Sequence, residues 1–358
     1  MTKDQIEARF LLNWPGFSLD IDLTLPGRGV TALFGQSGSG KTTLLRCMAG
    51  LERADEGFLS FKGETWQNGK TWLPAHRRPI GYVFQEASLF EHMTVRNNLH
   101  YGRKRIPAAR QTDLDPIIEL FGIGHLLGRK PDRLSGGERQ RVGIARALAV
   151  NPRMLLMDEP LSALDSARKQ EILPYLEKLR DRLDIPIVYV SHSPEEVARL
   201  ADYLVAMNNG KVMAHGPLKE TLARIDLPIR LGEEAGVVLD AVVAERDSSW
   251  HLAKLDFSGG SLWTRDKGIA LGRRVRVRVL ARDISLARDN REHSSIQNVL
   301  PGEVEAIADD EHPGLALVSV KVGPSVLVAR LTKRAAHMLE IAPGQAIWLQ
   351  IKSVALME

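Results

Sequence analysis

The chain has 358 residues, of which 44% are hydrophobic and 26% charged, and this composition excludes a disordered or low-complexity protein. A net charge of +4 is spread along the chain without a polybasic tail, so nothing in the charge pattern indicates a nucleic-acid-binding arm. With one cysteine, Cys47, and no apolar run long enough to cross a bilayer, we expect a cytosolic protein of two or three globular domains without disulfides.

The first strong pattern is the alternation of apolar and polar residues over 17–25, which predicts a half-buried strand. Trp14 stands just before this strand, where its indole either stacks on a purine ring or packs in the core against Pro15. Phe17 is the second candidate for stacking. The sequence alone leaves both roles of Trp14 open.

A glycine-rich loop follows the apolar run at 30–34 and leads into a predicted helix at 44–49. The loop residues that would surround a phosphate are Gly35, Gln36, Ser37, Gly38, Ser39, Gly40, Lys41, Thr42 and Thr43. The glycines let several backbone N–H groups converge on one anion, and the helix N-terminus adds its positive end. Lys41 would bridge the β and γ phosphates and the Thr42 hydroxyl would bind Mg²⁺. The loop therefore predicts a nucleotide site.

Two further apolar runs, 80–84 and 154–157, predict buried strands that end at polar residues. Gln85 follows the first run, and its amide can bind Mg²⁺ or position a water, although an isolated glutamine is also an ordinary loop residue. Asp158 would bind Mg²⁺ directly or through water, and Glu159 would accept a proton from the attacking water. A surface acidic pair is usually only solvated, but ligands of open α/β sheets bind where such strands end.

The segment Ser135-Gly136-Gly137 precedes a predicted helix at 138–149. Ser135 is a good N-cap, and the paired glycines allow a ligand to approach the helix N-terminus, so we expect a second phosphate site. Capping alone would explain the serine but not the two glycines. One nucleotide cannot easily occupy two such sites in one domain, so the simplest geometry places this site over a nucleotide held by another subunit.

The remaining polar site residue of this half is His192, which follows a predicted buried strand at 187–190. At a strand end it is well placed to contact a γ phosphate as a neutral donor, although an isolated histidine is more often structural. Other predicted elements of this half are a strand at 58–68, a basic, partly helical connection at 96–110, helices at 114–121, 167–183 and 195–200, a turn at 161–165 that contains Asp165, and a hairpin at 204–214.

After residue 225 the pattern changes to short alternating runs separated by Gly, Pro and Asp turns, which predicts an all-β half. Strands this short and evenly spaced are typical of small closed barrels of the oligonucleotide/oligosaccharide-binding (OB) type. In the run 274–279, where arginine and valine alternate, we expect the valines to face the core and the arginines to face water, rather than to form an anion-binding groove.

As a set, the motifs from Gly35 to His192 resemble an ABC-type ATPase domain. The resemblance covers about residues 1–230 and implies a P-loop α/β core with a helical subdomain at about 90–135. It implies the following roles: Lys41 and Thr42 in the phosphate loop, Gln85 as the Q-loop residue, Ser135 and Gly137 as the signature that contacts ATP across a dimer, Asp158 on Mg²⁺, Glu159 as catalytic base, Asp165 in the D-loop, His192 as the switch histidine, and Trp14 as the adenine-stacking aromatic.

A narrower resemblance is to the ATP-binding subunits of molybdate importers, and it is carried by residues 74–85 and 95–102. Three stretches of the all-β half, at 281–286, 294–302 and 351–354, resemble the molbindin-type barrel of those subunits. The expected division of this half is a β-rich OB-like segment at 231–290 and a molbindin-like barrel at 291–358. The resemblance implies that oxyanion contacts would come from Ser295, Lys352 and Ser353, with Gln297 standing where arginine is usual.

These resemblances imply a homodimeric ATPase that uses ATP and Mg²⁺ to power molybdate uptake, and tungstate is a second candidate substrate. It would act at the cytoplasmic face of the cell membrane through integral-membrane permease subunits, indirectly with a periplasmic oxyanion-binding protein and without nucleic acid. The alternatives are the same ATPase serving sulfate, ferric iron, polyamine or sugar, and a non-transport ABC ATPase acting on DNA or ribosomes. A further option is that the barrel senses oxyanion and regulates transport.

Overall fold

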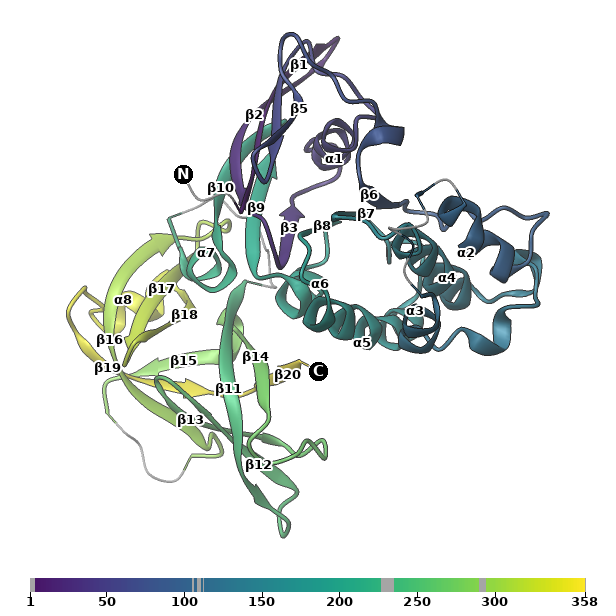
Figure 1. Cartoon of the computed structure of the whole chain (residues 1–358). Coiled ribbons are helices and arrows are strands. Elements are labelled where there is room, and N and C mark those ends of the chain that lie inside the picture. The colour runs from purple at the N-terminus through teal and green to yellow at the C-terminus, as the bar shows by residue number, and fades with distance from the viewer. Residues whose placement is uncertain are drawn as a thin grey trace. The chain divides into compact units, whose positions relative to one another are not determined.

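The computed structural model describes residues 4–104, 106–107, 111, 113–226, 235–289 and 294–357 (Figure 1). The chain divides into two compact units, Met1–His215 and Gly216–Glu358. The sequence predicts a domain change near residue 230, which lies outside the described residues.

The first unit is built on one ten-stranded sheet in the order β5-β4-β1-β2-β10-β9-β3-β8-β7-β6. Its strands are β1 (Gln5–Trp14), β2 (Phe17–Pro26), β3 (Val30–Phe34), β4 (Glu56–Phe61), β5 (Glu64–Gln67), β6 (Ile80–Val83), β7 (Met154–Asp158), β8 (Ile187–Ser191), β9 (Tyr203–Asn208) and β10 (Lys211–Pro217). Strands β3, β6, β7, β8 and β9 are parallel, whereas β1, β2, β4 and β5 pair antiparallel. The segments that follow β3, β6, β7 and β8 therefore meet at one edge of the sheet, where ligands bind in folds of this type.

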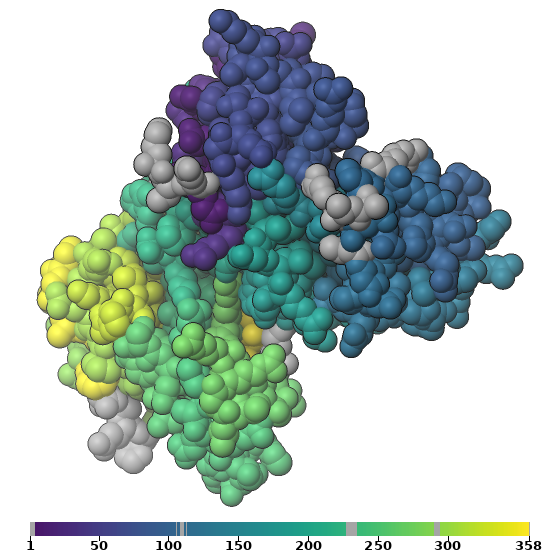
Figure 2. Space-filling view, viewed as in Figure 1, coloured from purple at the N-terminus to yellow at the C-terminus, as the bar shows by residue number. Residues whose placement is uncertain are grey.

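The helices of this unit cover two faces of the sheet. They are α1 (Lys41–Ala49), α2 (Val95–Arg103), α3 (Asp115–Leu120), α4 (Gly136–Leu148), α5 (Ser166–Arg182) and α6 (Pro194–Leu200). Helices α2, α3 and α4 pack together, and Figure 2 shows the segment that contains α2 and α3 as a lobe on the right of the unit. Of the helices in the described part of the chain, none combines the length and apolar character needed to span a bilayer.

Side chains of the central strands point alternately into two apolar clusters, one on each face of the sheet. In β7 and β8, Leu155 and Tyr189 join the apolar cluster with α4 and α5, whereas Leu156 and Val188 join the cluster with α1 and β1. Successive side chains of a strand point to opposite faces, so a strand that is buried on both sides must be apolar throughout. This is why the predicted runs before Asp158 and His192 contain no interior polar residue.

Several strands and helices of this unit end at residues other than those predicted from the sequence. The strand predicted at 58–68 is a hairpin of β4 and β5, because Lys62 and Gly63 both take positive φ, 50° and 84°, and turn the chain. The partly helical connection predicted at 96–110 contains α2, which ends at Arg103. Phe84 lies beyond β6 and is exposed.

The second unit contains two five-stranded antiparallel sheets, ordered β13-β12-β11-β14-β20 and β15-β19-β16-β17-β18. Its strands are β11 (Gly236–Asp247), β12 (Leu252–Phe257), β13 (Gly260–Arg265), β14 (Arg274–Leu280), β15 (Ile284–Ala287), β16 (Asn298–Asp309), β17 (Leu315–Val322), β18 (Ser325–Thr332), β19 (Ala346–Ile351) and β20 (Ala355–Met357), with helices α7 (Leu218–Ala223) and α8 (Lys333–Met338). β15 pairs with β19, and β20 pairs with β14, so each sheet takes one strand from the other predicted segment. The two sheets enclose one shared apolar core.

The link between the two sheets of this unit includes a side chain. The Asn298 amide accepts a hydrogen bond from the Trp263 N–H at 2.6 Å and donates to the Trp263 carbonyl at 3.0 Å. Asn298 begins β16 and Trp263 lies in β13, so this amide occupies the hydrogen-bonding edge of β13. At this edge the two sheets are therefore joined by a side chain instead of a backbone ladder.

The expectation for the arginines of 274–279 is wrong at one position. Arg278 is buried, with 8% of its surface exposed, and Arg276 is half-buried, whereas Arg274 faces water as predicted. Arg278 pairs on one side with Val238 and on the other with Ala355. A strand between two partners leaves less open surface than strict alternation assumes.

Candidate functional site

The loop between β3 and α1 has the curled backbone that its glycines predict. Gly38 and Gly40 take φ of 80° and 97°, and Gly40 is the N-cap of α1. A Cβ at Gly35 would lie 2.2 Å from the Met207 carbonyl oxygen, so only glycine fits there. The backbone N–H groups at the start of α1 have no carbonyl partner within the helix and form a place for an anion.

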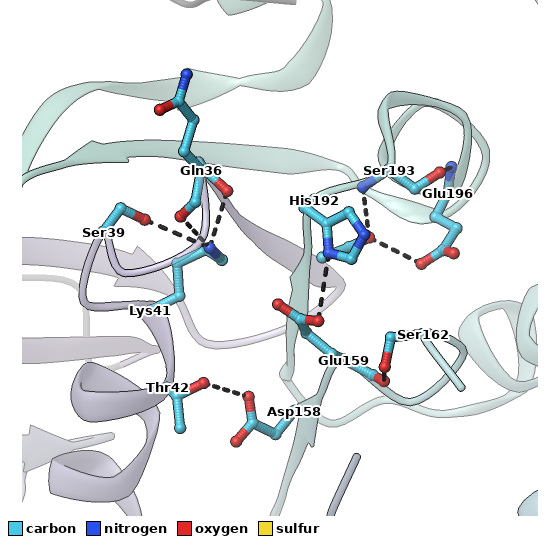
Figure 3. A network of polar contacts seen from close by, with 12 residues as sticks. Gln36, Ser39, Lys41, Thr42, Asp158, Glu159, Ser162, His192, Ser193 and Glu196 are labelled. Atoms are coloured by element: carbon cyan, nitrogen blue, oxygen red, sulfur yellow. Dashed lines mark hydrogen bonds and ion pairs between the residues drawn. The ribbon is translucent and has the colours of Figure 1, made fainter. Parts of the chain in front are cut away.

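The Lys41 ammonium lies inside this loop (Figure 3). Its Nζ donates to the carbonyl oxygens of Gly35 and Gln36, each at 2.8 Å, and to Ser39 Oγ at 3.4 Å. Burial lowers the pKa of Lys41, while the nearby Glu159 and Asp158 act in the opposite direction. A buried cation that is held by neutral carbonyls is well suited to bind an anion, because burial strengthens its interaction with that charge.

The Asp158 carboxylate, at the end of β7, is held by hydroxyl groups on both sides. Thr42 Oγ1 donates to Asp158 Oδ1 at 2.8 Å, and the Tyr82 hydroxyl donates to Oδ2 at 3.2 Å. Burial raises the pKa of Asp158, and the two hydroxyl hydrogen bonds partly oppose this shift. A buried carboxylate beside a threonine hydroxyl offers the hard oxygen atoms that Mg²⁺ prefers. The carboxylate and hydroxyl oxygen atoms at this position therefore fit a magnesium ion.

Glu159 and His192 are brought together from neighbouring strands. Glu159 Oε2 lies 3.3 Å from His192 Nδ1. The Glu159 backbone takes φ of 43°, a conformation that few residues other than glycine adopt, and Ser162 donates to its carbonyl oxygen from both the backbone and Oγ. This turn places the carboxylate at the sheet edge, as Figure 3 shows. A carboxylate beside an imidazole can accept a proton from water.

Of the residues described so far, Lys41, Thr42 and Glu159 line a cavity of about 450 Å³, whereas Asp158 and His192 are not among its lining residues. Its lining consists of Trp14, Phe17, Ser37, Gly38, Gly40, Lys41, Thr42, Thr43, Gln85 and Glu159. Gln85 is exposed after β6, and Thr43 and Ser37 complete the phosphate-loop side. The structure therefore unites the residues that the sequence assigns to the phosphate loop, Q-loop and catalytic base.

The packing alternative for Trp14 is wrong. Trp14 is 44% exposed and lines the cavity together with Phe17, and the two ring centroids are 6.1 Å apart. The turn between β1 and β2 holds both rings, because Trp14 pairs with Phe17 in the antiparallel register. An exposed aromatic pair at the rim can stack on a flat ring.

The second predicted phosphate site lies outside this cavity, since none of Ser135, Gly136, Gly137 and Asp165 is among its lining residues. Ser135 forms a capping box at α4: its Oγ accepts from the Glu138 N–H at 3.2 Å, and Glu138 Oε2 accepts from the Ser135 N–H at 2.7 Å. Asp165 caps α5 by accepting from the Arg168 N–H at 2.9 Å. Within one chain, both motifs act as helix caps.

None of the predicted oxyanion residues Ser295, Lys352 and Ser353 is among the lining residues of the cavity of about 520 Å³ described below for this unit. Ser295, Lys352 and Ser353 are all exposed, and the Lys352 N–H donates to the Asp283 carbonyl. A cavity of about 520 Å³ in this unit includes Gln297, but its other lining residues are Asp247, Trp250, Leu252 and Trp263. A carboxylate and two indoles do not favour an oxyanion.

Two residues of the first unit that the motifs leave out belong to the site. The Tyr82 hydroxyl donates to Asp158, and its only signal in the sequence was its position two residues before the end of the predicted strand at 80–84; the structure alone shows that this strand pairs with the strand of Asp158. Glu196 binds Ser191, next to His192, and its only signal was its position in the helix that follows the histidine.

The comparisons with known proteins agree with this geometry. The ABC transporter family model matches residues 19–162, and the TOBE domain model matches residues 294–357. The "Molybdenum import ATP-binding protein ModC" of Methylococcus capsulatus is 70% identical over 355 residues, which span 99% of this chain and 100% of that protein. A protein of the same name from Thiobacillus denitrificans is 65% identical and covers 98% of this chain and 97% of its own length.

Solved structures add the fold of the first unit. The cbiO1 protein of Clostridium perfringens, described as part of an ABC transporter complex, has a TM-score of 0.54 and 26% identity, with 62% of this chain and 92% of that chain covered. A nucleotide-free ATP-binding cassette from an ABC transporter has a TM-score of 0.53 and 26% identity, with 64% and 100% covered. The chain belongs to the family of ABC transporter ATPases, and within it to the molybdenum import ATP-binding proteins.

Proposed function

We propose that this protein is the ATP-hydrolysing subunit of an ABC importer, and that it powers molybdate uptake through a separate membrane permease. The observation that carries the proposal is the convergence of Lys41, Thr42, Glu159 and Gln85 on one cavity, in a chain 70% identical to a molybdenum import ATP-binding protein over nearly its whole length. ATP and Mg²⁺ are the implied substrate and cofactor.

The residues that line the cavity, with Asp158 and His192 beside them, would act either in nucleotide binding or in proton transfer. The loop N–H groups and the Lys41 ammonium would bind the β and γ phosphates, and Trp14 would stack on the adenine. Thr42, Asp158 and Gln85 would hold Mg²⁺, which when bound neutralises phosphate charge. Glu159 would accept a proton from the attacking water, and His192, in contact with it, would donate a ring N–H to the γ phosphate.

A second copy of the chain would complete the site. Ser135 is exposed and the N-terminus of α4 lies outside the cavity, so the positive end of this helix could attract an anion on the opposite molecule. ATP would then stabilise a homodimer in which each copy supplies half of the phosphate contacts, and hydrolysis would release it. Asp165, at the start of α5, would lie at the same interface.

The proposed dimer can be tested by comparing two variants, each of which loses the side-chain cap of one helix. Ser135→Ala and Thr94→Ala each remove a side-chain cap, from α4 and α2, at a cost of about 1 kcal/mol of stability. If Ser135 also touches the γ phosphate of a second copy, only its variant loses ATP-dependent dimer formation, measured by light scattering on a Glu159→Gln background. Equal dimer formation in both variants would contradict the proposed interface.

The partners follow from the same role. The protein would bind integral-membrane permease subunits at the cytoplasmic face of the cell membrane, near Gln85, and would act indirectly with a periplasmic oxyanion-binding protein and without nucleic acid. Vesicles reconstituted with the complete transporter can identify the substrate. We expect labelled molybdate to be imported with ATP inside, unlabelled tungstate to compete, and sulfate not to compete. Uptake of sulfate, ferric iron or a polyamine in place of molybdate would overturn the substrate assignment.

A further inference from the structure

A buried carboxylate lies directly behind the histidine of the site. The Glu196 side chain is 5% exposed, and three donors surround it. Its Oε2 accepts from the Tyr189 hydroxyl at 2.9 Å and from Ser191 Oγ at 2.8 Å, and its Oε1 accepts from Lys169 Nζ at 3.0 Å. Burying a carboxylate is costly unless each oxygen has partners, and here both oxygens have them.

One of these donors, Ser191, connects the carboxylate to the backbone around His192. Ser191 is the last residue of β8, is 3% exposed, and its Oγ also accepts from the Ser193 N–H at 3.0 Å. Ser193 Oγ then accepts from the Glu196 N–H at 3.4 Å and caps α6. His192 is therefore held between two residues that belong to one hydrogen-bonded ring (Figure 3).

The other two donors fix the carboxylate itself. Lys169 comes from α5, the helix that Asp165 caps, so its ion pair ties α5 to the segment that carries His192. The pKa of Tyr189 lies well above its ordinary value, mainly because the side chain is completely buried and to a lesser extent because of the Glu196 charge. Its hydroxyl therefore remains a donor. The carboxylate thus has a fixed position from which it can orient Ser191.

We propose that Glu196 is a positioning residue for ATP hydrolysis, which acts through Ser191 and the Ser193 backbone to hold the His192 imidazole against Glu159. The 3.3 Å contact between His192 Nδ1 and Glu159 Oε2 requires the histidine backbone to stay in one place, because its side chain is 56% exposed and has little packing of its own. This inference rests on the proposed hydrolytic function, in which His192 contacts the γ phosphate.

Two substitutions separate positioning from general stability. Ser191→Ala and Tyr189→Phe each remove one hydroxyl donor from the same Glu196 oxygen, so they lose the same contact to the carboxylate. Only Ser191→Ala also frees the Ser193 N–H. Misplacement of a catalytic group by about 1 Å can cost on the order of 100-fold in rate, so a loosened histidine loop should lower kcat without changing how ATP binds.

The experiment measures steady-state ATP hydrolysis by the full-length protein, together with amide hydrogen exchange of the peptide that contains His192 and Ser193. We expect Ser191→Ala to lower kcat by roughly tenfold or more, to leave KM for ATP within about twofold, and to speed exchange in this peptide. Tyr189→Phe should lower kcat by much less than Ser191→Ala and leave the exchange unchanged, because Ser191 and Lys169 still hold the carboxylate.

Equal kcat values in the two variants, or faster exchange without a loss of kcat, would overturn the positioning role. If both variants fail to fold, Glu196→Gln provides the test instead. This variant keeps one oxygen for the two hydroxyls but loses the charge that pairs with Lys169. Its kcat should fall less than that of Ser191→Ala, and a larger fall would contradict the route through Ser191. Failure of the proposed function itself is distinguishable, because the wild-type protein would then show no ATP hydrolysis that depends on Glu159.

Discussion

The Thr42 hydroxyl donates a 2.8 Å hydrogen bond to Asp158 Oδ1 and so joins the first turn of α1 to the carboxyl end of β7. These residues are 116 positions apart in the sequence, and their contact brings the phosphate loop and the acidic strand end to one point. A divalent cation at this point would be bound by oxygen atoms from both elements.

Thr42→Val keeps the shape of the side chain and removes this donor. We expect the Mg²⁺ concentration for half-maximal ATP hydrolysis to rise by tenfold or more, on the scale of about 1.4 kcal/mol per tenfold change, because a metal ligand is lost. Thr24→Val, at an exposed position of β2, is the control and should hydrolyse ATP like the wild type. An unchanged Mg²⁺ dependence in Thr42→Val would show that this hydroxyl does not bind the metal.

Asp158→Asn should separate stability from activity. Burial penalises the charged carboxylate, as its raised pKa indicates, so the neutral amide should increase the free energy of unfolding without nucleotide at pH 7, by on the order of 1 kcal/mol. Hydrolysis that depends on Mg²⁺ should be lost.

The increase in the free energy of unfolding that we expect for Asp158→Asn should become smaller as the pH falls. Because the folded-state pKa of Asp158 lies above the ordinary value of 3.8, the penalty is complete above the folded pKa and absent below 3.8, where both states are protonated. Denaturant unfolding at several pH values should therefore show the advantage of Asp158→Asn shrinking as pH falls through this window. An advantage that grows on acidification would contradict the burial argument.

Tyr82→Phe removes only the hydroxyl that donates to Asp158 Oδ2. We expect a loss of about 1 kcal/mol in the free energy of unfolding and a several-fold fall in kcat, because the carboxylate loses one of the two groups that orient it. Tyr203→Phe is the matched control, since the Tyr203 hydroxyl contacts His215 away from the cavity. If both variants keep wild-type kcat, Tyr82 has no role in orienting Asp158.

Trp14→Ala should weaken ATP binding, with KM raised by about tenfold and kcat little changed, because stacking on the adenine contributes about 1 kcal/mol or more. Trp14→Phe keeps a flat ring and should recover most of the affinity. Trp72→Ala tests for general effects of removing an exposed indole, since Trp72 is 37% exposed and is not among the cavity-lining residues. Equal KM values for Trp14→Ala and the wild type would exclude stacking.

Much of the candidate site could be predicted because its parts are local. The glycines, Lys41 and Thr42 lie in one loop, and Asp158 and Glu159 directly follow an apolar strand, so residue order alone indicates their chemistry. The parallel order of β3, β6, β7 and β8 then brings them to one edge.

The parts that the sequence did not predict depend on contacts between distant residues. Tyr82 reaches Asp158 only because β6 pairs with β7, and the buried Arg278 lies in β14 between partners on β11 and β20 that are distant in the sequence. Periodicity describes one strand and does not say which strand lies beside it. Likewise the exchange of β15 and β20 between the sheets of the second unit follows from pairing over long stretches of chain.

The most direct test of the account is molybdate uptake into vesicles that contain the complete transporter with Glu159→Gln in this subunit. We expect ATP still to bind and uptake to fall by on the order of 100-fold or more, while Glu195→Gln, an exposed glutamate of α6, imports at the wild-type rate. Normal molybdate import by the Glu159→Gln transporter would contradict the central claim that this carboxylate drives the ATP hydrolysis that powers transport.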